Sequence, residues 1–153
     1  MALNPCRLNI RRDVLYLRTM RQGTQVVTEH QSYMIMEKAE EYLENWCLAH
    51  GSSLRGSADV VKHHLKVTQK LPVLVNPYGG LFFFPTLSRD HPECIWINVT
   101  QIRKLIDLGN RTLIRFPKDE LELDIGIRSI RMQMKRCQVL RLRLAKQIDL
   151  MKG

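Results

Sequence analysis

Basic side chains, which can pair with phosphate or carboxylate groups, are concentrated at the C-terminal end of the sequence. Between residues 126 and 153 there are eight Lys or Arg residues and one acidic residue, so this segment carries 8 − 1 = +7 of a formal net charge of +9. A concentrated positive field of this kind favours a polyanion or an acidic surface as the partner. The charge distribution therefore indicates binding chemistry at this end of the chain.

The cysteine residues have spacings that do not indicate a metal site or a disulfide framework. They are far apart, no Cys-x-x-Cys pair occurs, and reduced thiols are the expected state in a cytosol. Cys47 or Cys94 could act as a nucleophile, with His50 or His91 as the base. Four cysteines and five histidines make such pairs expected by chance, so we predict no catalytic residues.

The other short motifs do not indicate a cofactor. His63 and His64 are adjacent, and adjacent side chains diverge on a helix and lie on opposite faces of a strand, so they rarely ligate one ion. Residues 51–56 are predicted to form a Gly/Ser-rich loop. Such a loop can cradle a phosphate, but this one lacks the Walker pattern. We expect neither a metal nor a cofactor.

One long helix would position seven of these eight basic residues. Residues 127–151 contain neither glycine nor proline, and apolar residues recur there every three or four positions, which is typical of an amphipathic helix. The apolar stripe consists of Ile127, Ile130, Met134, Cys137, Leu140, Leu144, Ile148 and Met151. Roughly opposite lie Arg128, Arg131, Lys135, Arg143 and Lys146, whereas Arg141 and Lys152 fall near the apolar stripe.

The basic side of this helix has two interpretations. A solvated charged face is the usual role of such side chains on a packed helix, but the lack of compensating acidic residues favours binding. Apolar residues also interrupt the basic side, so the helix could bury a second face in a partner. These residues are Met132, Val139, Leu142 and Leu150.

The central stretch, residues 71–96, is predicted to form a β-hairpin followed by a strand. Val73–Val75 and Leu81–Phe84 are short apolar runs, and the Asn-Pro-Tyr-Gly-Gly segment between them has typical turn chemistry. Pro85 then ends the second strand, because proline cannot donate to a sheet ladder. A third strand, carrying Trp96, is expected at residues 95–99.

Two further hairpins are predicted on either side of this stretch. Residues 14–19 and 24–28 form the first. Residues 112–116 and 121–125 flank a Pro-Lys-Asp-Glu turn and form the second, in which apolar and acidic residues alternate as in a strand with one solvated face.

Helical spacing of apolar residues and good helix formers predict a helix at about 34–49, which Gly51 ends. Residues 58–69 are ambiguous between helix and strand. The expected fold class is α+β, with a small, mainly antiparallel sheet built from hairpins and a long amphipathic C-terminal helix at about 127–151. The length suits one domain, residues 1–153.

The composition is that of an ordinary soluble globular protein, with 44% hydrophobic and 25% charged residues. No segment has enough consecutive apolar residues to span a bilayer, and the N-terminus lacks the apolar region of a signal peptide. We therefore expect a cytoplasmic location. Asn98-Val99-Thr100 fits a glycosylation sequon, which we interpret as a chance match.

Two motifs at fixed spacing occupy the middle of the chain. The first is Cys47-x-x-x-Gly51-Ser52-Ser53-x-x-Gly56. The second comprises Pro72, Asn76-Pro77, Leu81-Phe82-Phe83-Phe84-Pro85-Thr86-Leu87-Ser88, Pro92-Glu93-Cys94 and Trp96-Ile97. Together they resemble the ComK family, competence transcription factors of Gram-positive bacteria, over about residues 46–98. The chain differs from the family at Ser57–Val61, where a basic Arg-Lys followed by Gly-Thr is usual, and it ends sooner than long members.

The resemblance implies a transcriptional activator of competence and DNA-uptake genes that binds paired AT-rich boxes in double-stranded DNA, mainly through the minor groove. It also implies dimers that assemble on the site, and control by an adaptor and a Clp-type protease. The narrow minor groove of A-tracts has an enhanced negative potential that attracts arginine. We predict DNA contacts from Arg115, Arg128, Arg131, Lys135 and Arg143.

Two other functions stay open. The altered Ser57–Val61 segment motivates a ComK-like protein-interaction module that titrates a partner or a degradation adaptor without activating genes. RNA binding would also fit the charge, but the Phe82–Phe84 run lies in an apolar strand and lacks the RNP1 pattern. Core packing is the interpretation that we favour for those rings.

Overall fold

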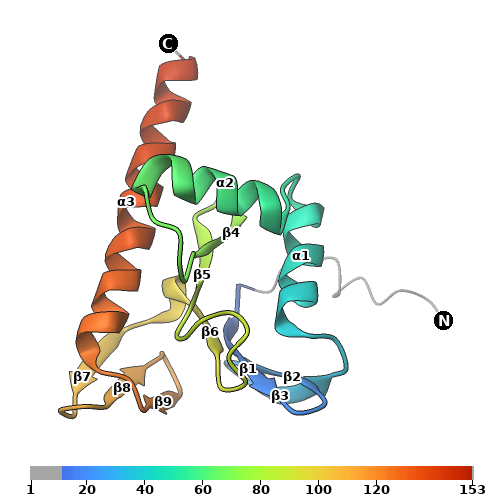
Figure 1. The fold of residues 1–153 in the computed structure, drawn as a ribbon, viewed down its shortest axis with the longest axis vertical. Helices are drawn as coiled ribbons and strands as arrows, with labels where there is room; N and C mark the ends of the chain where they lie inside the picture. The colour runs from blue at the N-terminus through green and yellow to red at the C-terminus, as the bar shows by residue number, and fades with distance from the viewer. Residues whose placement is uncertain (1–11, 153) are drawn as a thin grey trace.

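The structure, a computed structural model, describes residues 12–152 and combines two antiparallel sheets with three α-helices (Figure 1). In chain order the elements are β1 (Val14–Met20), β2 (Gly23–Thr28), β3 (Ser32–Ile35), α1 (Ala39–Ala49), α2 (Leu54–Leu65), β4 (Val73–Asn76), β5 (Leu81–Pro85), β6 (Ile95–Asn98), the 3-10 turn η2 (Val99–Gln101), β7 (Lys104–Asp107), β8 (Thr112–Arg115), β9 (Glu120–Leu123) and α3 (Ile127–Lys152). Cys6 lies outside the described residues.

The larger sheet has six strands in the order β3-β2-β1-β6-β5-β4, and the smaller sheet has three in the order β7-β8-β9. Every neighbouring pair is antiparallel. The predicted α+β fold class is confirmed, as are the three predicted hairpins and the strand that follows the central one. Strand β6 joins the N-terminal hairpin to the central hairpin, because it pairs with both β1 and β5.

Both faces of the larger sheet are covered, which explains why its middle strands are continuously apolar. On one face Phe82 and Phe84 pack with residues of α2, α3 and the smaller sheet. On the other face Phe83 packs with Trp46 of α1, at 5.6 Å between ring centroids. Figure 1 shows α1 and α3 on opposite sides of the strands. The three phenylalanine rings are therefore core residues, as the strand pattern predicted.

The helix predicted at about 34–49 begins later than expected, at Ala39. The residues before it form the edge strand β3, in which Tyr33 pairs with Val26 of β2. Tyr33 and Ile35 are half-buried while Ser32 and Met34 are exposed, so the period there is two rather than 3.6. Four residues are too few to tell a helical pattern from a strand pattern, and here pairing with β2 decided in favour of the strand. Gly51 follows the helix with φ +78°, as a C-terminal glycine should.

The segment predicted as a loop at residues 51–56 contains the beginning of α2. Ser53 is its N-cap, and its Oγ accepts a hydrogen bond from the backbone N–H of Gly56 at 2.9 Å. The ambiguous residues 58–69 are helical as far as Leu65. Strand β7 was not predicted. It is short, and only two of its four residues are half-buried.

Candidate nucleic-acid interface

Helix α3 lies against the larger sheet along one apolar stripe and leaves its outer side free. Ile130, Cys137 and Leu140 are buried within the core that also contains Phe82. Gln133 lies in the same interface and is only 2% exposed. Its Nε2 donates to the carbonyl oxygens of Lys70 and Pro85, both at 2.9 Å. These two hydrogen bonds therefore help to fix the position of α3 along the sheet.

The outer side of α3 presents four exposed cations. Within residues 12–152, none of these four side chains has a hydrogen bond or an ion pair. At 100° per residue they fall within about 60° of one another around the helix axis. They are Arg128, Arg131, Lys135 and Lys146. The helix has one acidic residue, Asp149, so this face is positive along most of its length.

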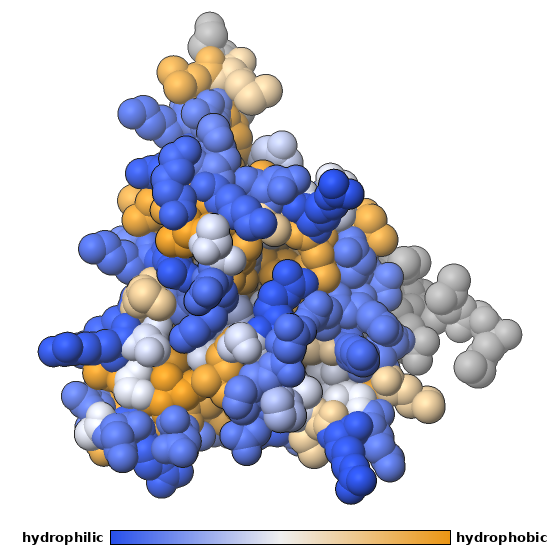
Figure 2. Space-filling model, in the orientation of Figure 1, coloured by the Kyte–Doolittle hydropathy of each residue, from blue (hydrophilic) through white to orange (hydrophobic). Residues whose placement is uncertain are grey.

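Apolar side chains are interleaved with these cations. Met132 is 41% exposed, Leu142 63% and Leu150 67%. Figure 1 shows the last turns of α3 projecting beyond α2, and Figure 2 shows apolar surface at this projecting end among hydrophilic side chains. The basic face is thus continuous with an apolar tip.

Two other arginines of α3 donate hydrogen bonds to backbone carbonyl oxygens within the fold. Arg143, a predicted DNA contact, donates from Nη1 to the carbonyl oxygen of His64 at the end of α2. Arg136 donates to the carbonyl oxygens of Gln69 and Lys70, at 3.0 and 3.3 Å. These bonds place the two guanidinium groups where α3 meets α2 and the loop after it, to one side of the outer face.

Arg115 is separate from the other predicted contacts. It lies on the exposed face of the smaller sheet, where its Nε donates to Oε1 of Glu120 at 2.9 Å. A second ion pair, Arg111 with Glu122, lies on the same sheet at 3.3 Å. The structure thus brings Arg128, Arg131 and Lys135 together on the first turns of α3. It separates Arg115 from them and places Arg143 at the edge.

The junction of α2 and α3 gathers cations that the sequence reasoning did not select. Lys66 caps α2 with φ 56°, and Lys70 has φ 50°, so two lysines occupy the left-handed region that favours glycine. Burial lowers the pKa of the His64 imidazole below its ordinary value, and nearby His63, Arg143 and Lys66 lower it further. The sequence did contain a sign of this junction, because basic residues are frequent in residues 58–69, the segment that was ambiguous between helix and strand.

The cysteine thiols considered as nucleophiles lie in the protein interior, where the reactive thiolate form is disfavoured. Cys47, Cys94 and Cys137 are buried free thiols. Burial raises the pKa of Cys47 and of Cys137 to about 12, and it also raises the pKa of Cys94. Each thiol is therefore held in its neutral, weakly nucleophilic form. Among residues 12–152, no group of three or more His, Cys, Asp and Glu side chains is arranged to hold a metal ion.

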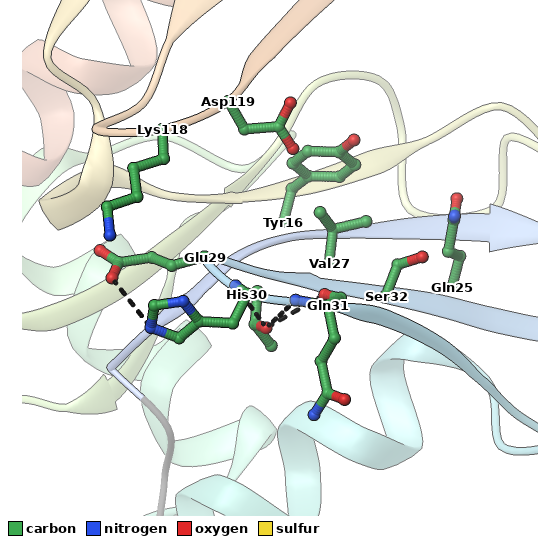
Figure 3. Close-up of a pocket in the computed structure, with 10 residues that line it drawn as sticks. Tyr16, Gln25, Val27, Glu29, His30, Gln31, Ser32, Lys118 and Asp119 are labelled. Carbon is green, nitrogen blue, oxygen red and sulfur yellow. Dashed lines mark hydrogen bonds and ion pairs between the residues drawn. The ribbon is translucent and has the colours of Figure 1, made fainter.

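The hollow shown in Figure 3 does not suit a polyanion. It lies between strands β1–β3 and the turn that joins β8 to β9, and Glu29 and Asp119 contribute carboxylates to its wall. His30 Nε2 lies 3.9 Å from Glu29 Oε2, and Lys118 points toward the same carboxylate.

Asn98, the first residue of the glycosylation sequon, is fully buried, and its Nδ2 donates to the carbonyl oxygen of Val14 at 2.9 Å.

Comparison with known proteins identifies the group to which this fold and this basic helix belong. The family model described as ComK protein matches residues 10–149, which include the central hairpin and almost all of α3. The chain belongs to the ComK family. The resemblance inferred from the sequence is therefore confirmed, and it extends well beyond residues 46–98.

A competence transcription factor of Bacillus subtilis (strain 168) is 27% identical to the chain over 119 residues. The match covers 76% of this chain and 62% of that protein, so the chain spans less than two thirds of this ComK relative. No solved structure matches the chain. Among residues 12–152, no helix combines the length and the apolar character that a membrane span requires.

The structure places the segment Ser57–Val61, at which a departure from the family pattern was inferred from the sequence. Ser57–Val61 lies inside α2, where Ser57 and Val61 are buried. Ser57 Oγ accepts a hydrogen bond from the backbone N–H of Leu74 in β4, at 2.8 Å. Part of this segment therefore packs against the sheet, and Asp59 is its exposed residue.

Proposed function

We propose that this chain is a DNA-binding transcriptional regulator of competence genes, acting as a single domain. The observation that carries the proposal is the outer face of α3, where Arg128, Arg131, Lys135 and Lys146 are exposed and unpaired within residues 12–152. A row of exposed cations along one face of a helix suits the regularly spaced phosphates of a duplex. Membership of the ComK family and the name of the Bacillus subtilis relative support the same function.

The surface proposed to meet DNA extends from α3 to the end of α2. Lys62 and Lys66 are exposed on α2, and Arg143 lies between them and the outer face of α3. Phosphate contacts along this surface would fix the position of the duplex but would not read its sequence. We propose that sequence preference comes from AT-rich boxes, whose narrow minor groove attracts arginine.

Assembly and control are further parts of the proposal. The chain would bind its paired boxes as a dimer or a higher assembly on DNA, and an adaptor with a Clp-type protease would regulate its level. Arg115 is proposed as a peripheral contact, since its ion pair with Glu120 is exposed and such pairs contribute little stability. A nearby phosphate could therefore replace the glutamate.

A second candidate function, a protein-interaction module, has one specific observation in its favour. Leu150 and Met151 are exposed near the end of α3, and Leu142 is exposed about two turns earlier. Exposed apolar side chains near one another often mark a protein contact. In this case the chain would titrate a protein partner and would not depend on DNA.

Binding to two duplexes of equal length decides between these functions. One duplex carries spaced A-tracts, the other is G·C-rich, and affinity is measured at several salt concentrations. A DNA-binding regulator should prefer the A-tract duplex at every salt concentration. Equal affinity for both duplexes would leave only generic polyanion binding, and no binding to either would favour the protein-interaction module.

A further inference from the structure

The turn between β4 and β5 presents an aromatic side chain to solvent at its apex. Tyr78 is 81% exposed, whereas the phenylalanine and tryptophan rings of the neighbouring strands are buried. The turn that carries it is nevertheless held firmly. The backbone N–H of Gly79 donates to Asn76 Oδ1 at 3.0 Å, so the turn is closed by its own first residue. A fixed turn with an exposed ring at its tip is a suitable recognition element.

Two arginines from distant parts of the chain donate hydrogen bonds to the backbone of this turn. Arg12 Nη1 donates to the carbonyl oxygen of Gly79 at 3.3 Å, and Arg141 Nη2 donates to that of Gly80 at 3.2 Å. Both arginines are exposed, and a guanidinium group has five N–H donors. These contacts occupy one donor of each group, so further donors remain on both arginines next to the turn that carries Tyr78.

Two glycines shape this turn. A Cβ on Gly79 would lie 2.5 Å from Arg12 Nη2 and from Asn76 Nδ2, so these side-chain ends would have to shift. Gly80 has φ +73°, which favours glycine, and a Cβ there would make only ordinary contact with Arg141 Nε, at 3.4 Å. Gly79 therefore leaves room for the Arg12 guanidinium group, and Gly80 provides the backbone conformation of the turn.

Among the residues that the structure describes, no carboxylate lines the hollow beside this turn. A hollow next to Tyr78 is lined by Pro77, Tyr78, Gly79, Gly80, Thr100, Arg141, Ala145 and Ile148. Its lining mixes apolar groups with one guanidinium group, from Arg141, and two hydroxyl groups, from Tyr78 and Thr100. Such a surface accommodates a ring or a sugar together with an anion, and it would not repel phosphate.

We propose that this turn is a second contact with duplex DNA, in which the Tyr78 ring packs into the minor groove against sugars and base edges. Arg12 and Arg141 then bind phosphates on either side of the ring. Proteins that use the minor groove often place apolar side chains there in this way. The inference rests on the proposed DNA-binding function and adds to it a contact from outside the basic face of α3.

Arg141 connects the two proposed contacts. It follows Arg131 on the same helix by ten residues, which corresponds to about 15 Å along the axis, and it lies about 80° to 140° around the axis from the four outer cations. The axial separation is less than the pitch of one turn of B-form DNA, about 34 Å. The proposal therefore has the duplex follow α3 from its outer face toward the side on which the turn lies.

Substitution of Tyr78 tests the proposal. Tyr78→Ala should weaken binding to the A-tract duplex about tenfold, because an aromatic contact with a nucleotide is lost. The dependence of affinity on salt should not change, since the ring releases no counterion. Tyr78→Phe should bind like the wild type. Met36→Ala is the matched control, because Met36 is 93% exposed and lies in the segment between β3 and α1.

A pair of glycine substitutions tests the role of the arginines. Gly80→Ala and Gly109→Ala both introduce a side chain at positive φ, but nothing lies within 4 Å of the new Cβ at Gly109. Gly80→Ala should weaken DNA binding because it strains the turn whose carbonyl oxygen binds Arg141, and Gly109→Ala, which strains the turn between β7 and β8, should leave binding unchanged. Urea unfolding of each variant confirms that comparable amounts of folded protein are compared.

The outcomes separate this inference from the proposed function. If Tyr78→Ala binds DNA like the wild type while substitution of Arg128 and Arg131 weakens binding, the turn is not a contact and the proposed function stands. If Tyr78→Ala lowers the salt dependence, the ring acts only by positioning phosphate contacts, and its place in the groove is wrong. If the wild type binds no duplex, both proposals fail.

Discussion

Arg141 on α3 donates a hydrogen bond from Nη2 to the carbonyl oxygen of Gly80, at 3.2 Å, in the turn of the central hairpin. Its guanidinium carbon also lies 5.8 Å from the centre of the Phe82 ring, within the range of a cation–π contact. The hairpin that carries the family motif is thereby joined to the helix that carries most of the net positive charge. Spacing in the sequence could not supply their relative position, to which this contact, the bonds of Gln133 and the apolar packing of α3 all contribute.

Gln133→Ala should destabilise the fold. The amide of Gln133 is buried and donates to two carbonyl oxygens. In the variant the carbonyl oxygen of Pro85 would lose this buried donor, whereas that of Lys70 would keep its bond from Arg136. We expect the free energy of unfolding to fall by about 1–3 kcal/mol. Urea denaturation measures this as a lower midpoint at an unchanged slope. Gln138→Ala, on an exposed position of the same helix, is the control, and an equal loss there would contradict the role assigned to Gln133.

Lys66→Gly should stabilise the fold, whereas Lys62→Gly should destabilise it. Glycine relieves the left-handed backbone at Lys66, which we expect to raise the free energy of unfolding by up to about 1 kcal/mol. Glycine within helix α2 at position 62 should lower it by about 1 kcal/mol.

Each of these variants also removes one positive charge from the same junction. Both should therefore reduce the slope of log affinity against log salt by about 0.9 if the junction contacts phosphates. Urea denaturation and DNA titration, applied to the same two proteins, separate stability from binding. A slope that stays at the wild-type value in both variants would remove the junction from the proposed interface.

The fold should lose stability as the pH falls through the range in which histidine titrates. The pKa of His64 is lowered in the folded protein by burial and then by His63, Arg143 and Lys66. The unfolded chain takes up a proton near pH 6.5, whereas folded His64 does so only at lower pH. The contribution is therefore fully present above about pH 6.5 and is lost progressively below it.

Unfolding by urea at a series of pH values between 7 and 5 measures this effect. His64→Gln should make the pH dependence shallower, because glutamine does not titrate. Lys66→Asn should act in the same direction, since it removes a positive neighbour and asparagine also tolerates the left-handed backbone. A His64→Gln variant with the full pH dependence of the wild type would show that other groups are responsible.

Local patterns in the sequence were sufficient to predict an element where its own hydrophobic periodicity was clear. The stripe from Ile127 to Met151 predicted α3, and the alternation in Leu121 and Leu123 predicted β9. The pattern failed where pairing decided the outcome. Ser32–Ile35 became a strand because β2 offers it a partner, and β7 exists because β8 pairs with it.

The candidate site was predictable in part for the same reason. Helical spacing alone placed Arg128, Arg131 and Lys135 on one exposed face. It could not show that Arg143 would donate to the carbonyl of His64, or that Arg115 would pair with Glu120, because both partners depend on how the chain folds.

The central claim is that the outer face of α3 binds duplex DNA through its free cations. It is tested most directly by the affinity for an AT-rich duplex across a salt series. The comparison is between the triple variant Arg128→Gln/Arg131→Gln/Lys135→Gln and a control of equal net charge, Arg21→Gln/Lys38→Gln/Arg89→Gln, whose positions lie in the first hairpin, before α1 and after β5. We predict that the first triple variant lowers the slope by about 0.9 for each residue removed, while the control keeps nearly the wild-type slope. Equal slopes for the two triple variants would contradict the claim.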